Sequence, residues 1–276
     1  MYANKKTVVL IVGATGPVGS GIARQFAGVL AKDSQLIITS RSKDRLNSLK
    51  ESSEKINPRI TVRALQWDLT KPNTDQFRND LRNSTTTKFE NAIIVINAFD
   101  HGNLAHSMLD IGENLPVLQE NLNINVLSAL TATSAFMELF GKASHKVVVD
   151  VTARSAFLPM ASFGYNCISK AARKMAFDTL AKERNDIKPG LVYSPAFDEI
   201  IKQTFNPELK AMFQAVVDNK EIMCQTGDHV GRVLVTYIES DKFESGNFVN
   251  ATKEDVPEDI DTTFPRIPNL TVNKKN

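Results

Sequence analysis

The stretch TVVLIVGATGPVGSG, from Thr7 to Gly21, decides the fold class. Its first half is a continuous apolar run, which is typical of a strand buried on both faces of a parallel sheet. Glycines and a proline follow at once, and residues 19–31, GSGIARQFAGVLA, then have the apolar spacing of a helix. A buried strand that turns tightly into a helix predicts the opening unit of an α/β domain.

The same alternation of strands and helices continues along the chain. Further apolar strands are predicted at residues 35–41, 60–69, 91–98 and 145–153, with a weaker one at 190–195, and helices at 43–55, 123–140 and 166–183. We therefore expect one α/β domain, residues 1–250, with a single doubly wound, Rossmann-like parallel sheet and helices on both faces. Residues 251–276 are polar and hold three prolines, which predicts an extended or partly disordered tail.

Composition narrows the choice of partners and compartment. The 276 residues are 42% hydrophobic and 23% charged, with a net charge of +2 and scattered basic residues, so neither nucleic acid nor a membrane is expected as a partner. Cys167 and Cys224 imply no disulfide framework. Among the histidines only His101 and His106 have a ligand-like spacing, and because zinc usually takes three or four protein ligands, no metal site is predicted. The N-terminus enters a strand without a signal peptide, and we expect a cytoplasmic protein.

The glycines after the first strand predict a phosphate-binding loop. Glycine allows a tight turn and a close approach of the backbone to a pyrophosphate, and the start of the following helix supplies free N–H groups. The alternative is that these glycines serve only the packing of helix on strand. The candidate cofactor-binding residues here are Gly13, Thr15, Gly16, Pro17, Val18 and Gly19.

Ser40 and Arg41 end the second strand, where the adenosine ribose of a dinucleotide would lie. An acidic residue at this place hydrogen-bonds the 2′-hydroxyl of NAD, whereas a basic one accommodates the 2′-phosphate of NADP. The sequence therefore favours NADP(H), unless Arg41 is only a solvated surface charge.

These segments and several others resemble the short-chain dehydrogenase/reductase family, and from about residue 7 to residue 250 the resemblance is to its sepiapterin reductase branch. The shared segments are the glycine loop, WDL around Asp68, INAF at 96–99, NINVLSALTATSAF from Asn123, and NCISKAAR at 166–173. The resemblance implies further cofactor-binding residues, namely Asp68, Leu69, Asn97, Ala98, Lys170 and Pro195. It also implies that Asn125 is the family's catalytic asparagine.

The resemblance also implies a chemistry whose residues are partly replaced here. In the family a tyrosine donates a proton to a carbonyl, a serine hydrogen-bonds the carbonyl oxygen, and a lysine holds the nicotinamide ribose. Alignment on Cys167 and Lys170 places Asn166 at the tyrosine position and Ala153 at the serine position. A shift by one residue would restore Tyr165 and Thr152, but it needs an extra residue in the helix before Lys170, such as a π-bulge.

Two functions therefore stay open. One is a sepiapterin-reductase-like, NADPH-dependent reductase of a small carbonyl compound, a pterin side chain or another ketone. The other is an impaired or inactive relative that binds the cofactor or a partner. The catalytic candidates are Asn125, Thr152, Tyr165 and Lys170, and the substrate-side candidates are Asn166 and Asn250, which stands where the resemblance implies an aspartate that anchors the pterin. A homodimer is expected through the helices that carry Asn125 and Lys170.

Overall fold

The computed structural model describes residues 4–85, 88–184, 186–193, 226–240 and 248–250, together with 204, 207, 210, 211 and 214. The expected tail, residues 251–276, and the candidate cofactor residue Pro195 lie outside the described residues.

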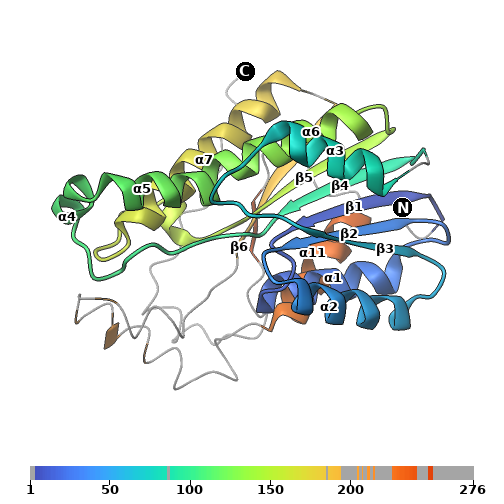
Figure 1. Ribbon diagram of the computed structural model, residues 1–276, viewed down its shortest axis with the longest axis horizontal. Helices are drawn as coiled ribbons and strands as arrows, with labels where there is room; N and C mark the ends of the chain where they lie inside the picture. The colour runs from blue at the N-terminus through green and yellow to red at the C-terminus, as the bar shows by residue number, and fades with distance from the viewer. Residues whose placement is uncertain are drawn as a thin grey trace.

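In this described part, seven parallel strands form one sheet in the order β3-β2-β1-β4-β5-β6-β7 (Figure 1). The chain moves outward from β1 in one direction through β2 and β3, then returns to the other side of β1 at β4. The carboxyl ends of β1 and β4 therefore flank the topological switch point, where α/β sheets bind ligands. The strands are β1 (Thr7–Val12), β2 (Gln35–Ser40), β3 (Thr61–Gln66), β4 (Asn91–Ile96), β5 (His145–Thr152), β6 (Ile187–Tyr193) and β7 (Phe248–Asn250).

Helices cover both faces of the sheet, as Figure 1 shows. The helices α1, α2 and α11 lie on one face, and α3, α6 and α7 lie on the other, so the predicted doubly wound α/β fold is confirmed. The helices are α1 (Pro17–Val29), α2 (Lys43–Ile56), α3 (Thr74–Ser84), α4 (Met108–Glu113), α5 (Leu115–Leu122), α6 (Ser128–Phe140), α7 (Gly164–Glu183) and α11 (Gly227–Glu239), with a 3₁₀ turn η2 at Arg154–Ala156.

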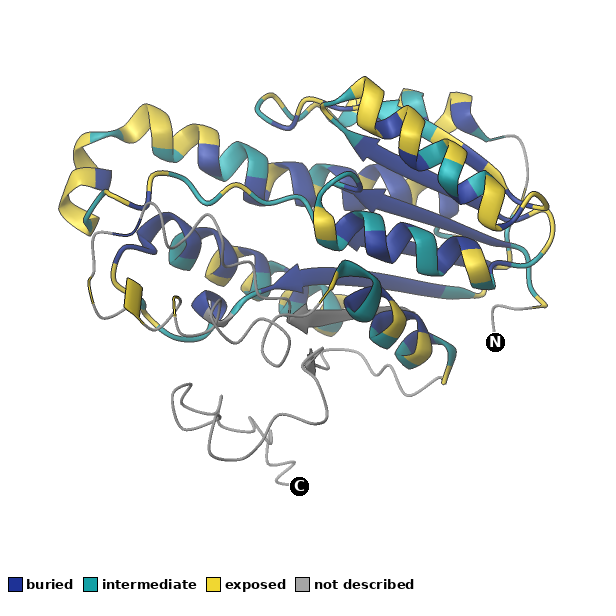
Figure 2. Cartoon of the chain, turned by 90° about the horizontal axis from the view of Figure 1, so that it is seen from below, coloured by how far each residue is buried: buried dark blue, intermediate teal, exposed yellow. Residues whose placement is uncertain are grey.

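The central strands explain why the apolar runs are continuous rather than alternating. In β1, Val9 and Ile11 pack into the core beneath α1 and α11, while Val8 and Leu10 pack into the core beneath α3 and α6. Successive side chains of a strand point to opposite faces, so a strand covered on both faces must be apolar at every position. Figure 2 shows these strands as buried along their length.

The long helix predicted at residues 123–140 begins earlier and has an irregular middle. A regular α-helix, α5, leads into a π-helical turn, η1 (Asn123–Leu127), and α6 follows directly. The helices α4 and α5 extend beyond the end of the sheet, and their surfaces are largely exposed (Figures 1 and 2). The π-turn lies at the inner end of this extension and holds Asn125. Such turns often mark functional sites in helices.

Candidate functional site

The glycine loop joins β1 to α1 and is packed against the end of β4. Gly13 has a φ of +83°, and a Cβ atom at Gly19 would lie 2.4 Å from the Gly13 carbonyl oxygen. The Asn97 side chain donates a hydrogen bond of 2.8 Å to the same oxygen. Gly13 and Gly19 are therefore required by the packing of the loop, as the alternative interpretation of the sequence supposed.

Gly16 is different, because packing does not explain it. Apart from its chain neighbours and the adjacent backbone of α1, no described atom lies within 4 Å of a Cβ built at Gly16, so a larger side chain would fit the protein itself. Gly16 is the N-cap of α1, which has no side-chain cap and no acidic residue in its first turn. An uncapped helix start with its positive dipole end exposed is suited to an anion such as a pyrophosphate. The residues present therefore fit a dinucleotide.

The loop is joined to the end of β2 by a short hydrogen bond. The hydroxyl oxygens of Thr15 and Ser40 lie 2.6 Å apart, and Ser40 Oγ also accepts from the Ser42 backbone N–H. The next residue, Arg41, is exposed. The structure thus joins the residue before Arg41 to the glycine loop, and the preference for NADP(H) stays a prediction.

Asp68 lies near Arg41 at the carboxyl end of the sheet. Its Oδ1 atom accepts hydrogen bonds from the backbone N–H and the hydroxyl of Thr70, at 3.0 and 2.8 Å. These bonds lower the pKa of the Asp68 carboxyl, and the charge of Arg41 adds to the effect. The neighbouring Leu69 is buried. Asp68 is therefore a fixed, ionised acceptor at the edge of the predicted adenosine site.

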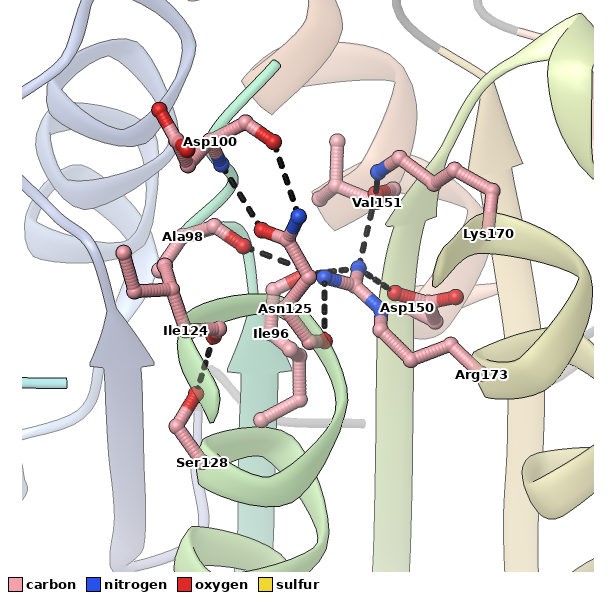
Figure 3. A network of polar contacts seen from close by, with 10 residues as sticks. All are labelled: Ile96, Ala98, Asp100, Ile124, Asn125, Ser128, Asp150, Val151, Lys170 and Arg173. Carbon is pink, nitrogen blue, oxygen red and sulfur yellow. Dashed lines mark hydrogen bonds and ion pairs between the residues drawn. The ribbon is translucent and has the colours of Figure 1, made fainter. Parts of the chain in front are cut away.

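Asn125 is fully buried and holds the loop that follows β4 (Figure 3). Its Oδ1 accepts from the Asp100 N–H at 2.7 Å, and its Nδ2 donates to the Asp100 carbonyl at 2.8 Å. Asn121 donates to the same carbonyl and accepts from the Ser169 hydroxyl at 2.6 Å. The backbone of Asp100 is thus bonded to both α5 and the π-turn, and Asn121 also joins α5 to Ser169 of α7.

Lys170 is almost entirely buried, 4% exposed, and has two contacts at its ammonium group. Its Nζ atom donates a hydrogen bond of 2.8 Å to the Val151 carbonyl and lies 3.9 Å from the centre of the Phe99 ring. Burial lowers the pKa of Lys170 to about 7. The aromatic ring occupies one side of the group that the resemblance assigns to the nicotinamide ribose, and a cofactor that reaches Lys170 must share the ammonium with Phe99 or displace its ring.

Arg173, which was not among the residues predicted for the site, makes several of the polar contacts in this region (Figure 3). It is completely buried and forms an ion pair with Asp150 in β5. It also donates 3.0 Å hydrogen bonds to the carbonyls of Ala98 and Val151, and a longer one to Asn125. Burial lowers the pKa of the guanidinium, but so basic a group remains charged at neutral pH. Arg173 therefore ties together the ends of β4, β5 and the π-turn.

The structure does not bring Tyr165 to Lys170. The Tyr165 hydroxyl hydrogen-bonds His106 Nδ1 at 3.0 Å, and the ring packs against the backbone of Gly102. Helix α7 is α-helical along its whole length, so the π-bulge that would have turned Tyr165 toward Lys170 is absent. Burial raises the pKa of the Tyr165 phenol further. Thr152, the other member of the shifted alignment, is buried, and its hydroxyl has no partner among the described residues.

Asn166 is instead paired with His101. Its Nδ2 donates to the His101 carbonyl at 3.0 Å, and its Oδ1 lies 3.2 Å from the imidazole Nδ1. The His101 ring also makes an edge contact with Phe99. The substrate-side candidate Asn250 ends β7, where its backbone is opposite Tyr193 in β6. Ala153 follows β5 directly and is half-buried.

The family model of short chain dehydrogenases matches residues 7–204. This span exceeds half of the chain, and the chain therefore belongs to the short-chain dehydrogenase family, a class of NAD(P)-dependent oxidoreductases. The sepiapterin reductases of Rattus norvegicus and Xenopus laevis are each 26% identical to it, over 254 and 253 residues. The alignments cover 88% and 87% of this chain and 95% and 94% of the two reductases.

Solved structures show the same fold at lower identity. A short-chain dehydrogenase from Salmonella enterica superposes with a TM-score of 0.72 at 15% identity, covering 90% of this chain and 97% of that one. A short-chain dehydrogenase from Shigella flexneri in complex with NADP gives 0.72 at 17% identity, with coverages of 90% and 98%. No helix in the described part of this chain is both long and apolar enough to cross a membrane.

Proposed function

We propose that this protein is an NADP(H)-dependent reductase of a small carbonyl compound. The observation that carries the proposal is the uncapped start of α1 at Gly16, open to a ligand and joined through Thr15 and Ser40 to the basic residue Arg41. This arrangement suits a pyrophosphate followed by a 2′-phosphate. When bound, the reduced nicotinamide supplies the hydride.

The chain's own residues would hold the cofactor along the carboxyl edge of the sheet. The backbone of residues 13–19 would bind the pyrophosphate, and Ser40 and Arg41 would bind the 2′-phosphate. Asp68 and Leu69 would border the adenine, and Asn97 and Ala98 would line the middle of the site. Lys170 is the residue available to the nicotinamide end. Pro195 belongs to the same proposal by resemblance.

The substrate class follows from the relatives and is the finer part of the proposal. Sepiapterin reductases match nearly the whole chain at about a quarter identity, so a pterin side-chain ketone is the first candidate, with other small diketones next. Asn250 replaces the carboxylate expected there, and an amide offers a single acceptor to the two N–H groups of a pterin edge. We therefore expect weak pterin binding.

A homodimer in the cytoplasm completes the proposal. Leu127 and Leu130, at the junction of η1 and α6, are 43% and 40% exposed, and Met175 on α7 is 66% exposed. Apolar side chains on the two helices that the family resemblance assigns to a dimer contact suit such an interface. Light scattering at micromolar concentration tests it, and a monomer there would contradict it.

A second function is favoured by specific observations. Ala153 lacks a donor, Asn166 is not an acid at neutral pH, and the Tyr165 hydroxyl is bonded to His106 rather than directed to Lys170. These features suit a relative that binds NADPH without reducing a carbonyl.

One experiment separates the two functions. NADPH binding is measured by quenching of its fluorescence, and oxidation is followed with sepiapterin and several diketones, for the wild type and for Ala153→Ser/Asn166→Tyr. The reductase predicts binding and turnover by the wild type. Binding with turnover only in the double variant would establish the second function.

An Arg41→Ala variant should lose at least about tenfold in NADPH affinity and little in NADH affinity, because only NADPH carries the 2′-phosphate.

A further inference from the structure

The helix α11 lies beside α1 on the same face of the sheet, and its first turn meets the start of α1, where the proposed phosphate site begins (Figure 1). We propose that α11 positions the glycine loop for the cofactor, and that Gly227, in the first turn of α11, is a positioning residue for cofactor binding. This inference rests on the proposed function and adds to it a part of the chain that is remote in sequence from the loop.

Gly227 meets the residues that follow Gly16. A Cβ atom built at Gly227 would overlap the carbonyl oxygen of Pro17 and would lie 3.0 Å from the Cα atom of Val18. Pro17 and Val18 belong to the first turn of α1, and both are candidate cofactor-binding residues. A side chain at position 227 would therefore push the start of α1 away from α11, and Gly16, the N-cap, would move with it.

The same close approach is repeated one turn further along both helices. A Cβ atom at Gly21 would overlap the carbonyl group of Gly227, and one at Gly231 would lie 2.8 Å from the Gly21 carbonyl oxygen. Gly227 and Gly231 are four residues apart and share one face of α11. The contact runs from backbone to backbone over a full turn, and it uses glycine at three positions although glycine is a poor helix former. No flexible side chain at these positions can absorb a shift.

An ion pair fixes how α11 is placed along α1. Arg24 Nε donates a hydrogen bond of 2.9 Å to Asp228 Oδ1, and its Nη2 donates one of 2.8 Å to Oδ2, although the two residues are 204 positions apart. A guanidinium that holds both oxygens of a carboxylate in this way favours one relative orientation of the two groups. Both side chains are partly exposed, so the pair contributes more to orientation than to stability.

Apolar packing attaches the rest of α11 to α1. Val230, Leu234 and Ile238 of α11 are buried in the same core as Ile22 and Phe26 of α1. Because protein interiors are close-packed, a displacement of one helix is passed to the other. The glycine loop therefore takes its position from α11 as well as from β1.

The position of the loop matters because its backbone groups would bind the phosphates. The direction of each N–H at the start of α1 follows the backbone, and an error of about 1 Å in a site can cost about a hundredfold. Coupling between two sites is reciprocal, so a cofactor that fixes the loop should also hold α11 more firmly against α1. This reciprocal effect separates a positioning role from a purely structural one.

The test compares three glycine-to-alanine variants. Gly227→Ala should weaken NADPH binding about 10- to 100-fold in isothermal titration calorimetry. Gly231→Ala alters the contact one turn beyond the loop, so it should lower the urea midpoint of unfolding and change NADPH affinity less than about threefold. Gly28→Ala is the matched control within α1, because the nearest atom to a Cβ there, outside its own helix, is Ile56 Cγ2 at 3.9 Å. This control should preserve both quantities.

A second readout uses the wild type, so it does not depend on how well a variant folds. Saturating NADPH should slow amide hydrogen exchange in a peptide that covers residues 227–239 by about threefold or more, relative to α3 on the opposite face of the sheet.

Three results would overturn the inference and leave the proposed function standing. They are an unchanged exchange rate in α11, an NADPH affinity of Gly227→Ala equal to that of the wild type, and equal losses of affinity in Gly227→Ala and Gly231→Ala, since general packing would then explain both. A wild type that binds no NADPH would overturn the proposed function together with the inference.

Discussion

The ammonium nitrogen of Lys170 lies 3.9 Å from the centre of the Phe99 ring and donates its 2.8 Å hydrogen bond to the Val151 carbonyl. A buried lysine normally needs an anion or several acceptors to remain charged. Here one carbonyl and an aromatic face replace water, and the pKa of Lys170 falls to about 7. This single relationship has consequences for both stability and cofactor binding.

The first prediction concerns stability and pH. The pKa of Lys170 is about 7 in the folded protein and near 10.4 in the unfolded chain, so between these values the unfolded chain binds more protons. The free energy of unfolding should therefore rise as pH increases from 7 toward 10, by up to about 4 kcal/mol from this group. Lys170→Met should lose this rise. Urea denaturation of both proteins at pH 7, 8 and 9 measures it, and parallel pH curves would contradict it.

The second prediction concerns the ring itself. Phe99→Ala removes the cation–π contact, which contributes about 1–2 kcal/mol when desolvated, and exposes the Lys170 ammonium to the cofactor. NADPH should then bind roughly 5- to 30-fold more tightly. Isothermal titration calorimetry provides the affinities. Phe157→Ala is the control, because Phe157 makes a similar contact with Lys174 instead of Lys170, and its removal should not change NADPH affinity.

The third prediction concerns the buried ion pair between Arg173 and Asp150, both of which are fully buried. Removal of one member of a buried pair leaves the other charge uncompensated and typically costs about 3–5 kcal/mol. Arg173→Met should therefore lower the free energy of unfolding by about that amount. Arg173→Met/Asp150→Asn should recover part of it, because no carboxylate is then left unpaired. If the double variant is no more stable than the single one, the lost backbone hydrogen bonds dominate instead.

The fold was largely predictable because its central strands are buried on both faces, and this burial requires apolar residues that are next to one another in the sequence. The runs at 7–14, 35–41 and 91–98 each have an uninterrupted apolar centre, and each contains a strand of the sheet. Helix α3 was missed because its sequence, TDQFRNDLRNS, is polar except for Phe77 and Leu81, which are the apolar residues it buries. A helix with so narrow an apolar face gives little periodic signal, and its tertiary contacts determine it.

The site was predictable only where its residues are close in sequence. The glycine loop and Arg41 follow from their place after particular strands, which is a local pattern. The pairing of His101 with Asn166 joins residues 65 positions apart, and no local pattern specifies it. The shifted alignment of Tyr165 needs a π-bulge in α7, but the π-turn lies at Asn123–Leu127 instead. Spacing shows where an irregular turn would help an alignment, whereas packing decides where one forms.

The last prediction settles the role of Tyr165. Its hydroxyl is bonded to His106 at 3.0 Å, and its ring is 1% exposed. Tyr165→Phe keeps the ring and removes only this hydrogen bond, so the free energy of unfolding should fall by about 0.5–1.5 kcal/mol and carbonyl reduction should be retained.

Urea denaturation and NADPH oxidation with the same diketone measure the two quantities. His106→Gln is the matched control, because it removes the other partner of the same bond. If Tyr165→Phe abolished turnover while His106→Gln did not, Tyr165 would be the proton donor, and a rearrangement of α7 on substrate binding would have to bring its hydroxyl toward Lys170. If both variants remained active, the Tyr165–His106 pair would serve only to hold the loop that carries His101 against α7.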